Sequence, residues 1–287
     1  LTLTMKPMLA FKVQQYGHQL SNPFYVQPKL NGVRALCNGT VFQSRDEHLW
    51  NDKVLAHLHT QIQPIFARFP HFITDGELYR HGLSLQKINQ AVAVNRHEPT
   101  STTPTIEYHI FDILDLEHAA KDFSYRAEQL HAIQSIITYY QLTHIKVVPT
   151  HHCGSMDMTE PLYKSYLKEG YEGLMYRSLG CMYGLKENCG NKENRWKCLL
   201  KRKEWLDKEF RIVEFRVTAG KKGEQGFQVI CAIEGSSNTF SVGSGLSDDD
   251  LGFYLKNSPV DAWAKVKFET YSDAGVPLKP TILAILA

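Results

Sequence analysis

The chain has 287 residues, of which 43% are hydrophobic and 22% charged, and its formal net charge is +2. This length is sufficient for one large domain or two moderate ones with a buried core. No apolar run approaches the ~18 residues of a membrane span, and the first ten residues lack a secretory signal, so we expect a cytoplasmic protein without membrane contacts. Six cysteines without a C-x-x-C pair are too few for a disulfide scaffold, so we expect reduced thiols and no structural zinc.

The first two thirds of the chain mix short strands with helices, which predicts an α+β domain with an antiparallel sheet. Short β-rich runs broken by Gly or Asn occupy residues 24–27, 35–37 and 41–43. Apolar residues recur at helical spacing over residues 54–69 and 123–140, and Ser124 is a candidate N-cap of the second helix.

Beyond Trp205 the pattern changes to strands separated by Gly-rich turns. We expect strands over residues 210–215, 227–233, 239–242 and 263–268, and one short helix over residues 247–257. Several short strands with one helix indicate a small β-barrel, for which the OB-fold is the natural candidate. The sequence therefore predicts two domains, 1–203 and 204–287.

Charged residues of the first domain occur in an order that suggests phosphate chemistry. Lys29 lies beside a glycine turn in the segment KLNGVR, where partial desolvation can make a lysine nucleophilic. Asp75 and Glu77 alternate on one strand and so share a face. Further along, Glu172 heads an apolar strand, and the segment LLKRK at 199–203 presents two lysines on one face.

In this order, the segments resemble the covalent nucleotidyltransferases, the superfamily of ATP-dependent DNA ligases, RNA ligases and mRNA capping enzymes. The resemblance rests on the motifs K-x-D-G-x-R, S-R, D-G-E, an aromatic motif, E-G and K-x-K, matched in turn by residues 29–34, 44–45, 75–78, 111–112, 172–173 and 201–203. It implies an ATP-grasp-like nucleotidyltransferase domain followed by an OB-fold domain, as in minimal DNA ligases of phages and bacteria.

The resemblance also implies how ATP is used. Lys29 would attack the α-phosphate of ATP and carry AMP as a phosphoramidate. The other residues with an implied role bind the nucleotide: Lys201 and Lys203 the phosphates, Arg34 the nucleotide as a whole, and Phe111 the adenine by stacking. Glu77 and Glu172 would bind the ribose or place a divalent cation, Mg²⁺ or Mn²⁺, since such ions take carboxylate and phosphate oxygens.

For the nucleic acid, the resemblance implies a nicked DNA duplex as the partner of a monomeric enzyme in replication or repair. Arg45 would bind the 5′-phosphate of the nick. Residues 186–222 hold twelve Lys or Arg against six Asp or Glu, and within this basic segment Lys221 and Lys222 are candidates for phosphate contact. Residues 207–213 and 242–248 also resemble the last domain of DNA ligases.

One position departs from the DNA-ligase pattern. Asn31 stands where DNA ligases normally have Asp, and it keeps the size but loses the charge. Two alternatives stay open because of it: an RNA ligase of the same superfamily, and a catalytically weak homologue that binds nicks. The R-x-D-K motif near the end is also absent, and Lys279 is the nearest candidate to replace it.

Overall fold

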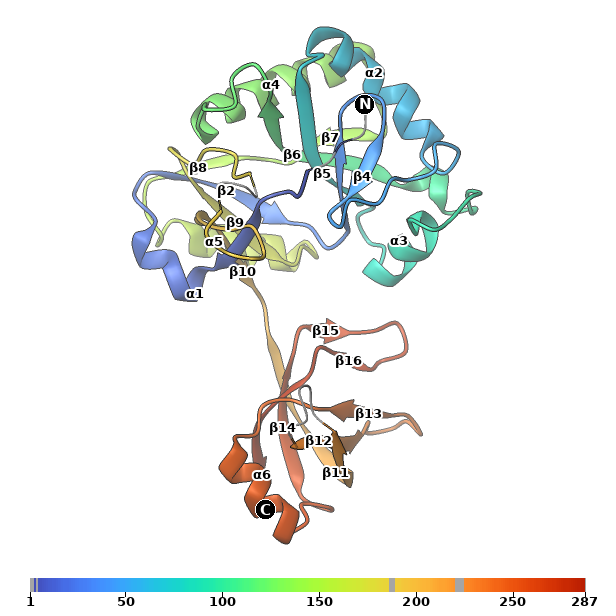
Figure 1. The fold of residues 1–287 in the computed structure, drawn as a ribbon, viewed down its shortest axis with the longest axis vertical. Coiled ribbons are helices and arrows are strands. Elements are labelled where there is room, and N and C mark those ends of the chain that lie inside the picture. Colours follow the sequence, from blue (N-terminus) through green and yellow to red (C-terminus); the bar gives the residue numbers. More distant parts are fainter. Residues whose placement is uncertain (1–2, 4, 186–188, 220–224, 287) are drawn as a thin grey trace. The chain divides into compact units, whose positions relative to one another are not determined.

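The computed structural model describes residue 3 and residues 5–185, 189–219 and 225–286. The chain divides into two compact units, Leu1–Lys203 and Glu204–Ala287, each with its own core (Figure 1). The first unit is built on two five-stranded sheets and the second on one.

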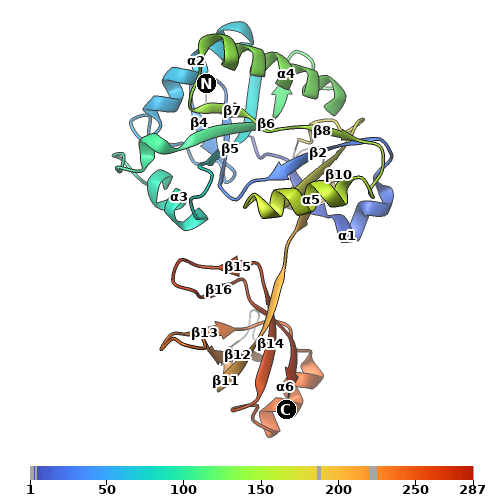
Figure 2. The same cartoon turned by 180° about the vertical axis from the view of Figure 1, so that it is seen from behind.

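The first sheet of unit 1 separates an apolar face from a polar one. Its strand order is β1 (Leu9–Lys12), β10 (Arg195–Lys203), β9 (Gly173–Ser178), β2 (Phe24–Lys29) and β8 (His151–Cys153), antiparallel except for β1 with β10. Val26, Leu174 and Leu200 pack in one core cluster with Tyr163 of α5 (Thr159–Lys168), which lies along this sheet (Figure 2). Side chains at alternate positions therefore point away from α5. The short α1 (Val13–Tyr16) and η1 (Gly17–Gln19) follow β1.

The second sheet has the order β4 (Phe42–Ser44), β3 (Val33–Cys37), β5 (Phe72–Tyr79), β6 (Glu107–Asp115) and β7 (Ile145–Val147). α2 (Ala56–Arg68) and α4 (Phe123–Tyr140) pack together over it and bury their apolar faces in the main core (Figure 1). α3 (Leu85–Val92) and η2 (Thr103–Thr105) lie in the connection from β5 to β6. None of the helices in the described part of the chain is long and apolar enough to span a membrane.

Three local expectations for unit 1 need correction. The N-cap of α4 is Asp122, whose side chain accepts the backbone N–H of Tyr125, and not Ser124. Helices α3 and α5 were not anticipated, because their apolar residues are few and short in span. The cysteines are not all reduced thiols, since Cys181 and Cys198 form a disulfide. These two cysteines are separated by 17 positions in sequence but meet because β9 and β10 pair side by side.

Unit 2 is a strongly twisted antiparallel sheet with one helix. The strand order is β13 (Thr239–Val242), β12 (Gln225–Ala232), β11 (Leu206–Ala219), β14 (Trp263–Phe268) and β17 (Thr281–Leu286). A small hairpin of β15 (Thr270–Tyr271) and β16 (Pro277–Leu278) stands beside it, and α6 (Asp248–Lys256) begins at a capping box of Ser247 and Asp250. Among the described residues no strand pairing joins β13 to β17, so the expected closed barrel is not seen as such.

Candidate active site

The two sheets of unit 1 enclose a cavity of about 600 Å³. One wall comes from the first sheet. The other comes from β3, β5 and β6 of the second sheet and from helix α3. Five predicted nucleotide-site residues line it together with Arg45: Lys29, Arg34, Glu77, Phe111 and Lys201. The predicted residues Glu172 and Lys203 join them through ion pairs with one another and with Lys29.

Strand register explains why the lysines lie together. Lys29 on β2 is paired with Gly173 on β9, which is paired with Lys203 on β10. Two residues away along each strand, Met175 lies between Gln27 and Lys201. Paired residues, and residues two apart on a strand, share a face of the sheet, so three lysines converge on the cavity side although 172 positions separate Lys29 from Lys201.

Glu172 is the counter-charge of this lysine group. Its carboxylate pairs with the ammonium groups of both Lys29 and Lys203, and all three side chains are less than one fifth exposed. Burial acts to raise the pKa of Glu172, but the two lysines outweigh burial and hold that pKa below its usual value. Glu172 is therefore ionised and keeps two lysines at the cavity.

Lys201 lacks such compensation. Its pKa is lowered to about 8, mostly by burial and to a smaller extent by repulsion from Lys203 and Lys29. A cluster of ammonium groups with one shared carboxylate leaves excess positive charge at this wall, and a polyanionic ligand such as a triphosphate would neutralise it.

Glu77 faces the lysine group from the other sheet. Its Oε1 accepts the backbone N–H of Gly32 at 2.6 Å, in the turn that follows Lys29. Burial raises the pKa of Glu77, while Lys29 and the Gly32 amide act in the opposite direction. A Cβ on Gly32 would lie 2.4 Å from the carbonyl oxygen of Leu78, so only glycine permits the turn to approach β5 this closely.

Two guanidinium groups lie near the ring of Phe111, which lines the cavity. Arg34 is 5.3 Å from its ring centre and Arg177 is 5.7 Å from it. The Phe111 carbonyl accepts the side-chain amide of Gln27 at 2.9 Å, which fixes the backbone as well as the ring. Arg34 itself forms a two-point ion pair with buried Asp75 at 2.8 and 2.5 Å. Most of its donors are thus used to hold it in place.

A second buried ion cluster supports this part of the cavity. Asp112 follows Phe111 in sequence and is fully buried between Arg126, at 2.7 Å, and Arg177, at 2.5 Å. The two arginines outweigh burial and lower the pKa of Asp112. With Arg34 and Asp75, the cluster has three guanidinium groups against two carboxylates beneath the cavity, which favours an anionic ligand above.

The remaining predicted contacts concern nucleic acid. Arg45 is largely exposed at the cavity rim, 3.6 Å from Asp46, and Ser44 before it is buried. Lys221 and Lys222 lie outside the described residues. Arg195 also lines the rim; it pairs with Glu193 and donates to the Ala10 carbonyl at 2.7 Å.

Sequence reasoning missed Gln27, Arg177 and Arg195. Gln27 stands two positions before Lys29, and Arg177 four positions after Gly173 of the E-G motif, so strand alternation from the predicted motifs could have found both. No comparable signal marks Arg195, because its place depends on the pairing of β10 with the N-terminal strand β1.

Comparison with known proteins assigns the chain to a family. Residues 7–199 match the family model of the ATP dependent DNA ligase domain. A solved Lig E DNA ligase structure is 22% identical, with a TM-score of 0.73 over 99% of this chain and 100% of that chain. A structure named Pmar-Lig_Pre is 20% identical, with a TM-score of 0.78 over 98% of this chain and 67% of that one.

The Chlorella virus DNA ligase-adenylate is 20% identical, with a TM-score of 0.53 over 99% of this chain and 100% of that one. No curated protein matches the chain. The likeness to these solved structures concerns the fold, whereas the family model matches about two thirds of the sequence itself. The chain therefore belongs to the family of the ATP-dependent DNA ligase domain and is a ligase that uses ATP.

Proposed function

We propose that the enzyme seals nicks with a 5′-phosphate and a 3′-hydroxyl in duplex DNA, through AMP bound covalently to Lys29. The observation that carries this proposal is the convergence of Lys29, Lys201 and Lys203 on one cavity wall, with Glu172 between two of them. A lysine beside other ammonium groups, in a partly buried cavity with room for a nucleotide, is suited to attack phosphorus.

In the first step, Nζ of Lys29 attacks the α-phosphorus of ATP, and pyrophosphate leaves. Lys201 and Lys203 stabilise the negative charge on the phosphate oxygens, while Glu172 orients Lys29 and Lys203 before ATP arrives. Adenine stacks on Phe111, whose ring is held by Arg34 and Arg177. Catalysis here is mainly positioning and charge neutralisation.

Glu77 and Glu172 are the residues that would hold a divalent cation, Mg²⁺ or Mn²⁺. The donor set fits, because Mg²⁺ usually takes one or two carboxylates and completes its shell with phosphate oxygens and water. Within the described residues no group of three or more His, Cys, Asp or Glu side chains is placed to hold a metal. When bound, the cation would neutralise phosphate charge.

In the later steps, AMP passes from Lys29 to the 5′-phosphate of the nick, and the 3′-hydroxyl then displaces AMP. Arg45, exposed at the rim, is the proposed ligand of that 5′-phosphate. The proposed substrate is a nicked duplex held by a monomer. The likeness to a Lig E structure, described as binding DNA with a minimal scaffold, supports DNA as the partner.

For unit 2 we infer an OB-type barrel. The backbone N–H of Ile282 on β17 donates to the carbonyl of Ser244, just after β13, at 2.9 Å. Gly245 also lies against Ile282, where a Cβ would be 2.1 Å from its carbonyl oxygen. These contacts bring the two edges of the sheet together around the core of Ile212, Val229 and Val266, as in a small closed barrel.

The test is incubation with ATP labelled at the α-phosphate and Mg²⁺, followed by addition of nicked DNA. We expect label on the wild type but not on Lys29→Ala, and release of the label as the nick closes. Lys53→Ala is the matched control, since Lys53 is an exposed lysine paired with Glu98 and does not line the cavity. Equal labelling of wild type and Lys29→Ala would refute the assignment of the nucleophile.

Asn31 motivates the alternative acceptors. A nicked RNA duplex in the same assay separates an RNA ligase from a DNA ligase, because only the preferred acceptor discharges the label. A homologue that only binds nicks would shift nicked DNA in a gel and acquire no label. Discharge on DNA alone is the expected result.

A further inference from the structure

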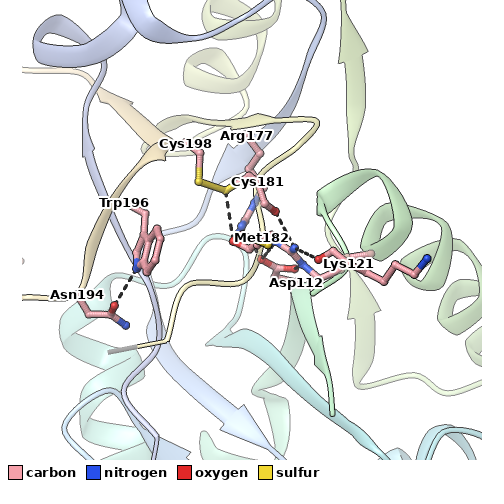
Figure 3. Close-up of a disulfide and its surroundings, with 9 residues drawn as sticks. Asp112, Lys121, Arg177, Cys181, Met182, Asn194, Trp196 and Cys198 are labelled. Carbon is pink, nitrogen blue, oxygen red and sulfur yellow. Dashed lines mark hydrogen bonds and ion pairs between the residues drawn. A yellow bond between two sulfur atoms is a disulfide. The ribbon is translucent and has the colours of Figure 1, made fainter. Parts of the chain in front are cut away.

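The disulfide adjoins the cavity wall in sequence, because Leu199, which follows Cys198, lines the cavity. Cys181 is in the segment that follows β9, and Cys198 is on β10, three positions before Lys201 (Figure 3). Cys181 is almost fully buried. The bond therefore joins the connection between β9 and β10 to the strand that carries two of the site lysines.

The backbone at Cys181 is a ligand of the Asp112 cluster. Its carbonyl accepts a hydrogen bond from Nη1 of Arg126 at 2.7 Å, and Arg126 pairs with Asp112. Asp112 in turn binds Arg177, which contacts the rings of Phe111 and Phe123. The position of Cys181 is thus linked to one of the two guanidinium groups near the ring of Phe111.

Two residues further on, the same segment supports the other guanidinium group. The buried hydroxyl of Tyr183 donates to Oδ2 of Asp75 at 2.6 Å. Asp75 holds Arg34, which is also close to the ring of Phe111. The short segment 181–183 therefore contacts both buried ion clusters beneath the cavity.

We propose that the Cys181–Cys198 disulfide is a redox-sensitive positioning link, which sets ATP affinity by holding segment 181–183 against both clusters. The proposal rests on the proposed function of the cavity. With the bond intact, the Cys181 carbonyl and the Tyr183 hydroxyl help to hold Arg177 and Arg34 near the ring of Phe111. With the bond broken, the segment loses its covalent connection to β10, and both supports weaken.

The chemistry requires a dithiol as reductant. Attack by one of its thiolates breaks the Sγ–Sγ bond through a mixed disulfide, and its second thiol displaces the remaining cysteine. Two electrons pass to Cys181 and Cys198, which become thiols with two protons, and the dithiol closes to its own disulfide. Reoxidation by a small disulfide reverses every step.

The experiment measures formation of the lysyl-AMP bond against ATP concentration, for oxidised enzyme and for enzyme reduced with dithiothreitol. We expect reduction to raise KM for ATP about tenfold with little change in kcat. The hydrogen bonds from segment 181–183 to the two ion clusters support the proposed adenine site at Phe111 and not the nucleophile Lys29. The Cys181→Ser/Cys198→Ser variant should reproduce the reduced value and ignore dithiothreitol. Cys189→Ser, a free thiol in the same connection, should respond as the wild type.

A double-variant comparison separates positioning from general stabilisation. Tyr183→Phe in the oxidised enzyme should also raise KM for ATP, and adding it to the serine variant should raise KM less than the two separate effects combined. Independent effects, or the same KM in the oxidised and reduced enzyme, would overturn the proposal. If the oxidised and the reduced enzyme both form lysyl-AMP with the same KM, the disulfide proposal is wrong but the proposed function stands. If neither form of the enzyme is labelled, the proposed function itself is wrong.

Discussion

At the scale of single residues, the site is governed by charges that burial leaves incompletely neutralised. Lys201 is the clearest case, because burial and two neighbouring lysines lower its pKa to about 8. Its ammonium group is therefore present below about pH 8 and loses its proton as the pH rises through that value. A phosphate ligand is attracted only by the protonated form.

We expect the affinity for an ATP analogue with a methylene bridge between the α- and β-phosphorus to fall roughly tenfold from about pH 7 to about pH 9. Such an analogue cannot react with Lys29, so the measurement, by calorimetry, reports binding alone. In Lys201→Arg the guanidinium stays charged, and the decline should shift out of this range. An equal decline in both proteins would show that another group titrates.

Gly173 gives a second prediction at this scale. Its φ is +147°, and an added Cβ would lie 2.1 Å from the carbonyl oxygen of Arg202 on the neighbouring strand. Gly173→Ala should push β9 and β10 apart between Lys29 and Lys203, reduce lysyl-AMP formation, and cost about 2 kcal/mol or more of stability. Gly180→Ala, with open space around the new Cβ, should change neither quantity. Urea unfolding and labelling measure the two effects.

At the scale of elements, sequence periodicity predicted what depends on local pattern. The span of α4, residues 123–140, is the same in the structure, because eighteen residues provide a long, unambiguous apolar repeat. The expected strand 210–215 lies inside the longer β11, whose exposed ends alternate too weakly to be read from the chain. α5 was missed because only Thr159, Tyr163 and Tyr166 of its ten residues are buried.

The residues of the site also divide into those that a local sequence pattern indicates and those that depend on tertiary packing. Lys29, Glu77 and Phe111 could be picked out because each stands in a short motif of the printed sequence. Asp112 stands in the same motif as Phe111, but its ion pair with Arg126 could not be predicted, since a buried ion pair is visible only after β6 and α4 are packed together. The disulfide was also hidden, because it depends on the register of β9 with β10 and no cysteine spacing indicates it.

The disulfide predicts a stability effect separate from its effect on ATP. A closed loop of this length, with a sequence separation of 17, removes conformational entropy from the unfolded chain. The Cys181→Ser/Cys198→Ser variant should lose about 3 kcal/mol of unfolding free energy relative to the oxidised wild type. Urea unfolding of both proteins without reductant measures this difference. Coincident unfolding curves would contradict the expectation.

At the scale of the whole molecule, charge is divided unevenly. Residues 1–203 contain 23 Lys or Arg against 18 Asp or Glu, a net +5, whereas residues 204–287 contain 9 against 12, a net −3. The net charge of +2 therefore hides a basic catalytic unit and an acidic second unit. Because phosphate contacts release counterions, the salt dependence of DNA binding should arise mainly from unit 1.

The contribution of a single phosphate contact to the salt dependence of DNA binding can be measured at Arg45, at the cavity rim. If it neutralises the 5′-phosphate of the nick, Arg45→Gln should reduce the slope of log affinity against log salt by about 0.9 on nicked DNA. The decrease should be smaller on a nick without the 5′-phosphate. Arg68→Gln removes the same charge from the exposed end of α2, away from the cavity lining, and should leave the slope unchanged. Fluorescence anisotropy over a salt series measures both variants. Equal slopes for Arg45→Gln and Arg68→Gln would show that Arg45 adds only to the general positive charge of unit 1 and makes no phosphate contact of its own.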